Sequence, residues 1–547
     1  MRRSHAAVAV AAVAVLVGTS LWWFLRGDGG PQETARRYLD AWQRGDYAAM
    51  QALVDDPPAD FAERHRRLRD DLGAARWMFT LASLGDAKDG VAGGAYEAKI
   101  TLAGDRTWAY QAALPFVQRD GAWRVDWNTR VLHPDLKDGQ RLRASRAWPD
   151  RAPILSAEGS SLLGHSSGSV QQLVGAVGKL TAEQAKQLGA PYREGDPAGT
   201  SGLQQQYEKR LAGTPALAVQ IVDGEGGVVK TLQRFGGKEG APLRTTIDPA
   251  VQQSAGEALA DVDKPASLVA VRPATGEILA VANKPGGYNR ALMGQYPPGS
   301  TFKIITAAAL VADGVSPSSS VACPATTNVG GRSFRNSEHK DYGTVSFRDA
   351  FAHSCNTTFA RMAVDRLGEE RLAQVAHMFG FGAPIIGGLP AVRGAFPSTK
   401  DATALAAASF GQGQVLASPL NMASVAAAAA DGTWRSPRLV PAADAPQALD
   451  AKGRKPERPR PLESGVTRAL RSLMPAVVSE GTAAGVGFPS GTAGKTGTAE
   501  FGSGDKPPTH AWFVGYRKDV AFAVIVEGGG TGAEAAAPIA ARFLRGL

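Results

Sequence analysis

The sequence predicts a multidomain α+β protein that follows a single N-terminal transmembrane helix. The chain has 547 residues, which is enough for roughly three or four domains. An apolar run lies close to the N-terminus, and the remainder mixes short strand-like runs with alanine-rich helical stretches. Hydrophobic residues make up 44% of the chain and charged residues 20%, proportions that are typical of globular domains rather than of disordered chains.

The composition excludes several classes of function. The formal net charge of +9 is mild for this length and suits an anionic surface such as a membrane or cell wall. We expect no nucleic-acid partner, because such a partner favours a concentrated basic stripe. The two cysteines are too few for a disulfide-dense scaffold or a cysteine-rich zinc module. The eight histidines show no paired metal-binding spacing, so no metal and no other cofactor is expected.

The N-terminal segment predicts the cellular location. Two arginines in a short tail, residues 1–5, precede an apolar run at 6–25. A helix of this length spans about 30 Å, the thickness of a hydrocarbon core, and the aromatic residues at 22–24 suit its boundary. The arginines predict a cytoplasmic tail, a single-pass anchor in the plasma membrane and an extracytoplasmic remainder. A cleaved signal peptide is the alternative, disfavoured because the run is long and no small-x-small site follows it.

Residues 31–150 are expected to form a small α+β domain. Strand-like runs lie at 95–102 and 107–117, and Asp120-Gly121 is typical of a tight hairpin turn because the glycine supplies a positive φ. Tryptophans alternate with other residues after this turn. We interpret them as a half-buried sheet face, with a ligand cleft as the less favoured alternative.

The rest of the chain divides into an irregular segment at 151–240, with a helical stretch from Thr181, and one large unit at 245–547. The large unit is expected to contain two strands and two alanine-rich helices, at 267–271, 278–281, 303–313 and 419–430. A proline-rich basic stretch at 452–460 is expected to be a solvated loop.

The sharpest motif is Pro-Pro-Gly-Ser-Thr-Phe-Lys at 297–303. An apolar helical pattern follows the Pro-Pro-Gly breaker, so Ser300 is expected at a helix N-terminus with Lys303 one turn later on the same face. A serine hydroxyl needs a neighbouring base to become a nucleophile, and lysine can be that base where burial and nearby positive charge lower its pKa. A surface helix with a capping serine is the alternative reading of this motif.

A second motif, Ser354-Cys355-Asn356, places a hydroxyl and a carboxamide two residues apart. From a tight turn both side chains can point into one cleft. The Ser354 hydroxyl can then relay a proton between a lysine and a leaving group, and the Asn356 amide can hold a substrate carbonyl.

The third motif, Lys495-Thr496-Gly497-Thr498, is expected on a strand fed by a glycine-rich turn. Gly497 has no side chain, so an extended substrate can lie alongside the backbone there. Lys495 supplies positive potential, Thr496 offers a hydroxyl to a carboxylate, and the Thr498 amide can help to form an oxyanion hole. An ordinary strand with a solvated lysine is the alternative.

The order Ser-x-x-Lys, Ser-x-Asn, Lys-Thr-Gly resembles that of the penicillin-binding transpeptidases and serine β-lactamases. Further segments are similar to the same transpeptidase domain, at 245–248, 296–303, 410–413, 494–500 and 510–516. The resemblance implies a domain at 245–547 with an antiparallel sheet flanked by helices.

The resemblance extends upstream of this domain. Residues 199–213 are similar to the pedestal, or dimerisation, domain of class B penicillin-binding proteins, which implies a pedestal at 151–240, and residues 31–150 look like the NTF2-like (MecA-N-like) domain of one group of them. Two departures concern the pedestal. Residues 151–156 replace the usual Arg-Gly-x-x-x-Asp-type start, and Gln204 stands where an acidic residue is common.

The resemblance implies a penicillin-sensitive, serine-type D,D-transpeptidase that cross-links peptidoglycan stem peptides through an acyl-enzyme, with D,D-carboxypeptidase hydrolysis as a side activity. β-Lactams are expected to mimic D-Ala–D-Ala and to acylate the same serine. The implied roles are the nucleophile Ser300, the base Lys303, the proton relay Ser354, the substrate clamp Asn356, the carboxylate-binding Lys495, Thr496 and Thr498, and the oxyanion-hole amides of Ser300 and Thr498. Residues 26–240 do not resemble a glycosyltransferase, so glycan polymerisation is expected from a partner, by analogy a polytopic polymerase.

Two other functions stay open at this point. A class A serine β-lactamase needs a glutamate to activate the deacylating water, and no Glu-x-x-Leu-Asn lies between Asn356 and Lys495. A β-lactam sensor or scaffold that is acylated without turnover is the other alternative; a sensor would need a signalling module, whereas a scaffold would not.

Cys323 and Cys355 can form one disulfide in an exported domain. A bonded pair and two free thiols are both compatible with the sequence, because a disulfide depends on the distance between the two Cα atoms.

Two further motifs match without the context that they require. Gly-His-Ser-Ser-Gly at 164–168 has the pattern of a nucleophile elbow but lacks a preceding strand-like run. Gly-Lys-Thr at 494–496 resembles a phosphate-binding loop, but Pro489 occupies the place of its first glycine.

Overall fold

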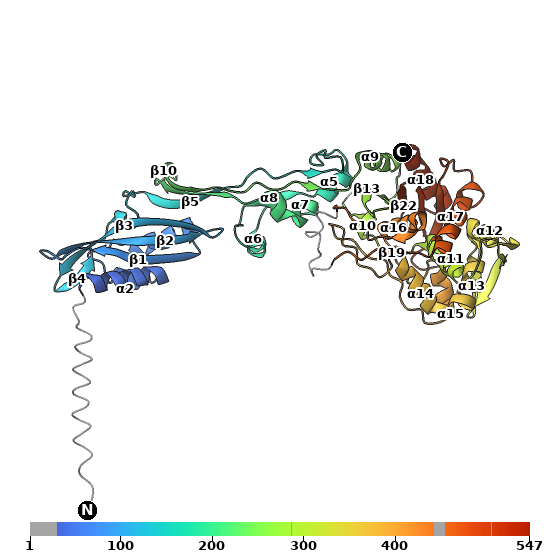
Figure 1. Cartoon of the computed structure of the whole chain (residues 1–547), viewed down its shortest axis with the longest axis horizontal. Helices are drawn as coiled ribbons and strands as arrows, with labels where there is room; N and C mark the ends of the chain where they lie inside the picture. The colour runs from blue at the N-terminus through green and yellow to red at the C-terminus, as the bar shows by residue number, and fades with distance from the viewer. Residues whose placement is uncertain (1–29, 286, 442–454, 505) are drawn as a thin grey trace, which may run out of the picture. The chain divides into compact units, whose positions relative to one another are not determined.

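The computed structural model describes residues 30–285, 287–441, 455–504 and 506–547 (Figure 1). The predicted tail at 1–5 and transmembrane helix at 6–25 lie outside these ranges. Across the described ranges, no helix combines the length and the apolar composition that a membrane span requires.

The chain forms two compact units, each assembled from segments that are not contiguous in sequence. Of the described residues, the first unit comprises those up to Asp150, Leu180–Asp196 and Gly213–Glu239. The second comprises Arg151–Lys179, Pro197–Ala212 and the described residues from Gly240 onward. The sequence suggests contiguous domains at 31–150, 151–240 and 245–547. The compact units are not contiguous in sequence, so they do not test these ranges, which stay predictions.

A four-stranded antiparallel sheet with helices packed against it forms the N-terminal part of the first unit. The strands, in the order β1-β2-β3-β4, are β1 (Arg76–Leu84), β2 (Val91–Leu102), β3 (Arg106–Arg119) and β4 (Ala122–Val125). The helical segments are α2 (Pro31–Arg44), α3 (Tyr47–Gln51), α4 (Phe61–Leu72) and the short turn η1 (Thr129–Val131). Tyr38 and Trp42 of α2, one helical turn apart, are buried in one core with Tyr96 of β2, and α2 runs along the sheet in Figure 1.

The predicted strands at 95–102 and 107–117 and the predicted hairpin turn are confirmed. Asp120 and Gly121 have φ values of 51° and 79°, as a two-residue turn with positive φ at both positions requires. Trp123 and Trp127 are partly buried against the core, which confirms their interpretation as packing residues. β4 ends before Trp127, so the expected alternating strand is shorter than the sequence indicates.

A three-stranded sheet with the order β10-β9-β5 completes the first unit. Its strands are β5 (Arg141–Ala147), β9 (Ala216–Val222) and β10 (Val228–Phe235). The helix predicted from Thr181 is α6 (Ala182–Leu188), which begins with a capping box because Thr181 and Gln184 each accept a hydrogen bond from the other's backbone N–H.

The pedestal part of the second unit consists of short elements. They are β6 (Ile154–Leu155), which pairs in parallel with β11 (Leu243–Arg244), α5 (Gly168–Val174), β7 (Val177–Lys179), β8 (Pro197–Gly199), α7 (Gly202–Gln206) and α8 (Glu208–Ala212). Arg151 donates to Gln204 Oε1 at 2.8 Å and to Glu208 Oε2 at 2.8 Å. Gln204, where the resemblance leads one to expect an acidic residue, therefore still accepts a hydrogen bond from Arg151.

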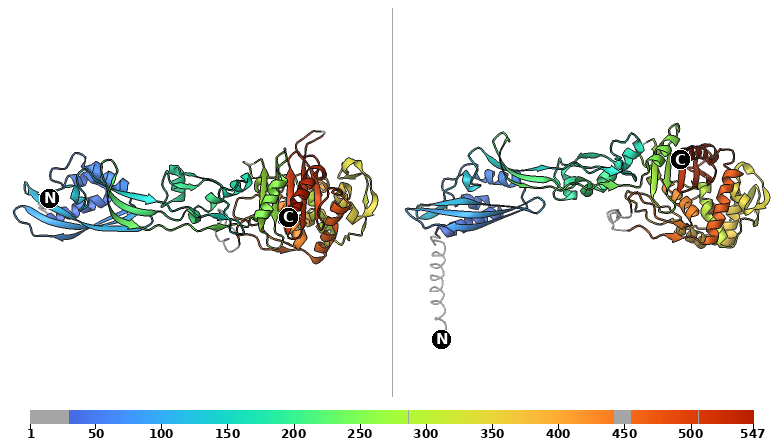
Figure 2. Two further views of the ribbon diagram at one scale, coloured as in Figure 1. Left: turned by 90° about the horizontal axis from the view of Figure 1, so that it is seen from above. Right: turned by 45° about the horizontal axis from the view of Figure 1, so that its top comes forward.

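A five-stranded antiparallel sheet with the order β13-β12-β22-β21-β20 is the centre of the second unit. Its strands are β12 (Ala266–Val271), β13 (Ile278–Lys284), β20 (Ala493–Glu500), β21 (Thr509–Arg517) and β22 (Val520–Val526). In Figure 2 the green β12 and β13 lie beside the red strands from the C-terminus of the chain, as the pairing of β12 with β22 requires. Every residue of β12 and β22 is buried, so both faces of these strands are covered.

Helices and small two-stranded sheets make up the rest of this part of the unit. α9 (Pro249–Ala258), α16 (Pro419–Asp431), α17 (Ser464–Ser479), η6 (Gly532–Ala536) and α18 (Ala537–Arg545) contact the strands of the five-stranded sheet. The remaining elements are α10 (Arg290–Met293), η2 (Gly299–Phe302), α11 (Lys303–Ala312), β14 (Ser320–Cys323), β15 (Thr326–Val329), β16 (Arg332–Arg335), η3 (Ser337–His339), β17 (Gly343–Ser346), α12 (Phe347–Ala352), α13 (Asn356–Met362), η4 (Ala363–Leu367), α14 (Gly368–Met378) and α15 (Ala402–Ser409). Strands predicted at 267–271 and 278–281 and helices at 303–313 and 419–430 are confirmed as β12, β13, α11 and α16.

The predicted solvated loop at 452–460 is wrong at its end. Residues 452–454 lie outside the described ranges, and residues 455–459 are exposed as expected. Arg460, however, begins β19 (Arg460–Pro461), which pairs with β18 (Thr433–Trp434). Its guanidinium lies 4.7 Å from the centre of the Trp434 ring, because the face of an indole attracts a cation.

Candidate active site

Ser300 lies in the 3₁₀ turn η2, immediately before α11, which confirms its predicted place at a helix N-terminus. Gly299 has φ +53°, and a Cβ there would lie 2.7 Å from the Thr498 carbonyl oxygen of β20. Both the backbone conformation and this close approach require glycine. The glycine therefore allows the turn that carries Ser300 to pack directly against β20.

Lys303 begins α11, and its side chain is fully buried. Its Nζ donates to Asn356 Oδ1 at 2.7 Å, to the Ser354 carbonyl oxygen at 2.7 Å and to Ser354 Oγ at 3.2 Å. The aromatic rings of Phe359 and Phe410 also face this amine, at 5.4 and 5.8 Å. The structure thus brings the first two sequence motifs together at one amine.

The electrostatic setting lowers the Lys303 pKa well below the ordinary value. Burial is the largest cause, because an ammonium loses its hydration there, and the positive charge of Lys495 is the second. The acceptors around Lys303 are neutral, and among the described residues it forms no ion pair. A lysine in this setting can be a neutral base near neutral pH.

Ser354 and Asn356 lie on the tight turn between α12 and α13. Ser354 has φ +59°, a left-handed conformation that is uncommon for a residue with a side chain. Asn356 is the first residue of α13, and its Nδ2 donates to the Arg335 carbonyl oxygen at 2.9 Å. The Asn356 carboxamide therefore orients Lys303 through its oxygen, a role that the sequence did not suggest.

Lys495 lies on β20, the edge strand of the five-stranded sheet, and is fully buried. Burial lowers its pKa to about 7. Its Nζ donates to the Thr496 carbonyl oxygen at 3.1 Å and lies 5.7 Å from the centre of the Phe351 ring. The alternative of a solvated lysine is therefore wrong.

The other residues of the third motif connect β20 to its neighbours. The hydroxyls of Thr496 and Thr482 are 2.6 Å apart, and Thr498 Oγ1 accepts a hydrogen bond from the Gly532 N–H at 3.3 Å. A Cβ at Gly497 would lie 2.8 Å from Thr301 Cγ2. The need for glycine at this position thus comes from the turn that carries Ser300 rather than from room for a substrate.

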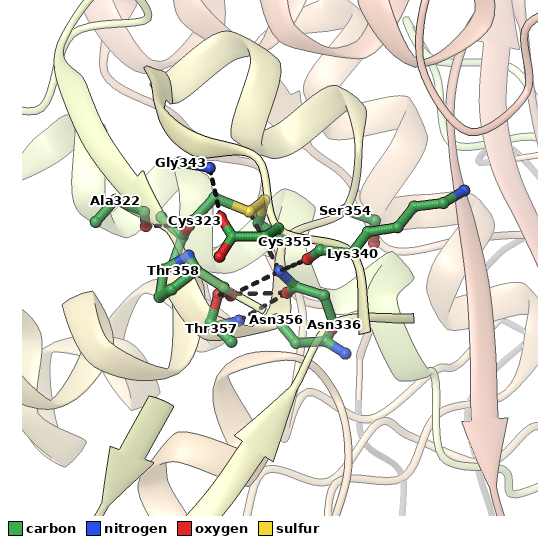
Figure 3. The surroundings of a disulfide bond; sticks show 12 residues. Ala322, Cys323, Asn336, Lys340, Gly343, Ser354, Cys355, Asn356, Thr357 and Thr358 are labelled. Atoms are coloured by element: carbon green, nitrogen blue, oxygen red, sulfur yellow. Dashed lines mark hydrogen bonds between the residues drawn. A yellow bond between two sulfur atoms is a disulfide. The ribbon is translucent and has the colours of Figure 1, made fainter. Parts of the chain in front are cut away.

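Cys323 and Cys355 form a disulfide, with their Cα atoms 6.0 Å apart (Figure 3). Cys355 is the residue between Ser354 and Asn356, so the bond reaches the second motif directly. Asn336 forms hydrogen bonds with Cys323 and with Thr357, two residues after Cys355, and carries no sequence signal that would identify it. Thr482, whose hydroxyl lies beside that of Thr496, likewise belongs to no motif, so the sequence does not identify it.

The other sequence candidates lie apart from this site or hold no ligand. Ser166 of the Gly-His-Ser-Ser-Gly match is exposed in a loop before the short α5. Residues 494–496 lie within β20 and not in a phosphate-binding loop. In the ranges that the structure describes, no group of three or more His, Cys, Asp or Glu side chains is arranged to hold a metal ion.

A serine at a helix start, two buried lysines and a Ser-x-Asn turn beside an edge strand define a serine acyl-transfer enzyme of the penicillin-binding class. The profile described as "Penicillin binding protein transpeptidase domain" matches residues 266–545, and the chain belongs to this family. The profiles of an NTF2-like N-terminal transpeptidase domain and of a penicillin-binding protein dimerisation domain match residues 30–140 and 165–245.

Individual relatives agree with this assignment. The chain is 34% identical to the peptidoglycan D,D-transpeptidase PbpA of Mycolicibacterium smegmatis over 353 residues, which cover 55% of this chain and 71% of the relative. It is 27% identical to the peptidoglycan D,D-transpeptidase MrdA of Acinetobacter baumannii over 431 residues, or 66% and 62% of the two chains. The solved D,D-transpeptidase domain of a peptidoglycan glycosyltransferase from Eggerthella lenta is similar with a TM-score of 0.56 at 25% identity, covering 74% of this chain and 98% of that one.

Proposed function

We propose that this protein is a penicillin-sensitive, serine-type D,D-transpeptidase that cross-links peptidoglycan stem peptides through an acyl-enzyme on Ser300. The observation that carries the assignment is the Lys303 amine. It is buried, its hydrogen-bond acceptors are neutral atoms of Ser354 and Asn356, and Lys303 directly follows the turn that carries Ser300. A general base with a lowered pKa beside a serine is what covalent acyl transfer requires.

Acylation follows from these groups. Ser300 Oγ attacks the carbonyl carbon of the terminal D-Ala–D-Ala bond, and its proton passes to the neutral amine of Lys303. The negative charge that develops on the carbonyl oxygen is stabilised by the backbone N–H groups of Ser300 and Thr498. The C–N bond then breaks, and D-Ala leaves as an amine that takes a proton relayed by Ser354.

Transfer completes the cross-link. The amine of a neighbouring stem peptide attacks the acyl ester on Ser300, loses a proton to the same relay and releases the serine. β20 is an edge strand, so an extended peptide can add alongside it, with Lys495 and Thr496 on the side of its carboxylate. Asn356 holds the substrate carbonyl through its amide.

We place the enzyme in the plasma membrane as a single-pass protein, with residues 6–25 as the anchor and the catalytic domain outside. The arginines before the apolar run and its aromatic end support this topology. The three matched domains are NTF2-like, dimerisation and transpeptidase domains, none of which polymerises glycan. A separate polymerase, by family analogy a polytopic one, would therefore supply the glycan strands.

The test is Ser300→Ala in the full-length protein, labelled with a fluorescent penicillin and assayed for cross-linking of stem peptides. We expect both signals to be lost, and Ser166→Ala, which changes the exposed serine of the unused motif, is the matched control that keeps both. Labelling of Ser300→Ala at the wild-type level would remove Ser300 from its role. Rapid hydrolysis of a chromogenic cephalosporin by the wild type would instead indicate a β-lactamase, and acylation without cross-linking would indicate a scaffold.

A further inference from the structure

The turn that carries Ser354 and Asn356 is held by a disulfide to Cys323 and by hydrogen bonds to Asn336 (Figure 3). The disulfide ties Cys355, in the middle of this turn, to Cys323 at the end of β14. Both cysteines are buried, and 32 residues separate them in the sequence. A covalent link across such a separation restricts where the turn can lie relative to β14.

Asn336 connects the same two segments without a covalent bond. Its Nδ2 donates to Cys323 Sγ at 3.3 Å and to the carbonyl oxygens of Pro324 and Lys340 at 3.0 Å each. Its Oδ1 accepts from the backbone N–H of Thr357 at 3.2 Å. The side chain is buried, and its donors and acceptor all go to the strand end, the neighbouring loop and the start of α13.

The geometry of the turn needs such support. Ser354 has a left-handed backbone, a conformation that persists in a residue with a side chain only where the surroundings enforce it. The acceptors of the Lys303 amine are the Ser354 carbonyl and hydroxyl and the Asn356 amide oxygen. Any movement of the turn is therefore a movement of the groups that orient the base.

We propose that Cys323, Cys355 and Asn336 form a turn brace that positions Ser354 and Asn356, and through them the Lys303 amine, for acylation of Ser300. The three members of the turn brace are positioning residues, since none of them contacts the serine or the amine. This inference rests on the proposed acylation of Ser300 and adds to it the claim that the disulfide controls the rate of that step.

The turn brace predicts a specific kinetic pattern. Small displacements of catalytic groups cost up to about 100-fold in rate, so we expect Cys323→Ala to lower the limiting rate constant of acylation by penicillin by roughly 10- to 100-fold. The apparent dissociation constant before acylation should change little. Burial holds the Lys303 pKa low, and Lys495 is the charged group that acts on it. A looser turn admits water, raises that pKa and moves the acid limb of the acylation pH profile upward.

The experiment compares Cys323→Ala, Cys355→Ala and the double variant with Asn336→Asp, in the full-length protein. If the covalent bond is what matters, either single cysteine variant should be as slow as the double variant. Asn336→Asp replaces a donor by an acceptor among three acceptor atoms, and should slow acylation in the same way. Asn283→Asp is the matched control, a buried asparagine on β13, at the opposite edge of the sheet from β20. It should lower the melting temperature without moving the pH profile.

The turn brace is overturned if the double cysteine variant has the limiting acylation rate constant and the pH profile of the wild type. This holds whatever the change in its melting temperature. If the cysteine variants do not fold, the wild type is reduced with a phosphine while free thiols and acylation rate are followed together. A rate that falls as two thiols appear supports the proposal, and a rate that persists with two thiols overturns it. These outcomes are distinct from failure of the proposed function, which Ser300→Ala tests directly.

Discussion

Cations with little or no solvent exposure occur in two regions of the second unit, and their surroundings differ. In the pedestal, Arg151 is 17% exposed and pairs with Glu208, which is 4% exposed. In the active site, Lys303 and Lys495 are fully buried, and among the described residues neither forms an ion pair. In the pedestal a carboxylate compensates the partly buried guanidinium, whereas the active-site lysines face neutral acceptors, and their burial lowers their pKa values.

The difference separates a structural cation from chemically active amines. An ion-paired guanidinium keeps its charge at all relevant pH values and ties chain segments together. An amine held by neutral acceptors gives up its proton more easily, at a cost in stability. Substitution of one cation at a time tests this difference.

The largest effect is expected at Lys303. Lys303→Met removes the base and should lower penicillin acylation and transpeptidation on the order of 10²- to 10⁴-fold. Lys303→Arg, which keeps a positive charge but cannot become neutral, should fail equally. Acylation rates from stopped-flow fluorescence measure both. Appreciable activity of the arginine variant would mean that positive charge, and not a neutral base, is what the site needs.

A smaller effect, on stability, is expected in the pedestal. Arg151→Met removes the guanidinium from Glu208, which keeps a hydrogen bond from the Gly199 N–H at 2.6 Å, and should destabilise the fold by about 1.5–3 kcal/mol through the lost charge-assisted hydrogen bonds. Thermal unfolding measures the loss, and the acylation rate per folded molecule should be unchanged. The control is Arg366→Ala, which breaks the exposed pair with Asp313 and should cost less than about 1 kcal/mol. A pedestal variant as stable as this control would show that the buried pair contributes no net stability.

The last effect, small within any one pH unit, is the pH dependence of stability that Lys495 contributes. Its pKa is about 7 in the folded protein and near its ordinary value of 10.5 in the unfolded chain. Between these values the unfolded chain binds a proton that the folded protein does not, so this contribution to stability rises with pH from about 7 to 10.5. Relative to Lys495→Met, the wild type should gain up to about 1.4 kcal/mol per pH unit in this window. If the free energies of unfolding of the two proteins changed with pH by the same amount between pH 7 and 9, this result would contradict the lowered pKa of Lys495.

Features encoded in neighbouring residues were predictable from the sequence. Ser300 and Lys303 share a helix start because a Pro-Pro-Gly breaker precedes an apolar helical pattern, and Asp120-Gly121 forms its hairpin because the turn needs positive φ. Resemblance to the family then joined three distant motifs that no local pattern connects. The structure brings Ser354 and Asn356 to the buried Lys303 amine and places Lys495 close enough for its charge to act on that amine.

Features that depend on long-range contacts were not predictable. β5 pairs with β9 although residues 148–215 lie between them in the sequence. The compact units are therefore not linear stretches of sequence. The sequence places Arg460 in a solvated loop because the surrounding stretch is basic and proline-rich. Its contact with the Trp434 ring depends on the pairing of β18 with β19, which no local pattern indicates. Asn336 carries no motif at all, and its role depends on three segments that meet only in the folded chain.

The most direct measurement is the intact mass of the full-length protein after exposure to penicillin, followed by digestion and mapping of the adduct. A single penicilloyl group on Ser300 is the predicted result, with formation that slows at acidic pH as Lys303 becomes protonated. An adduct on another residue, or a protein whose mass does not change, would contradict the assignment of Ser300 as the nucleophile served by a neutral buried lysine.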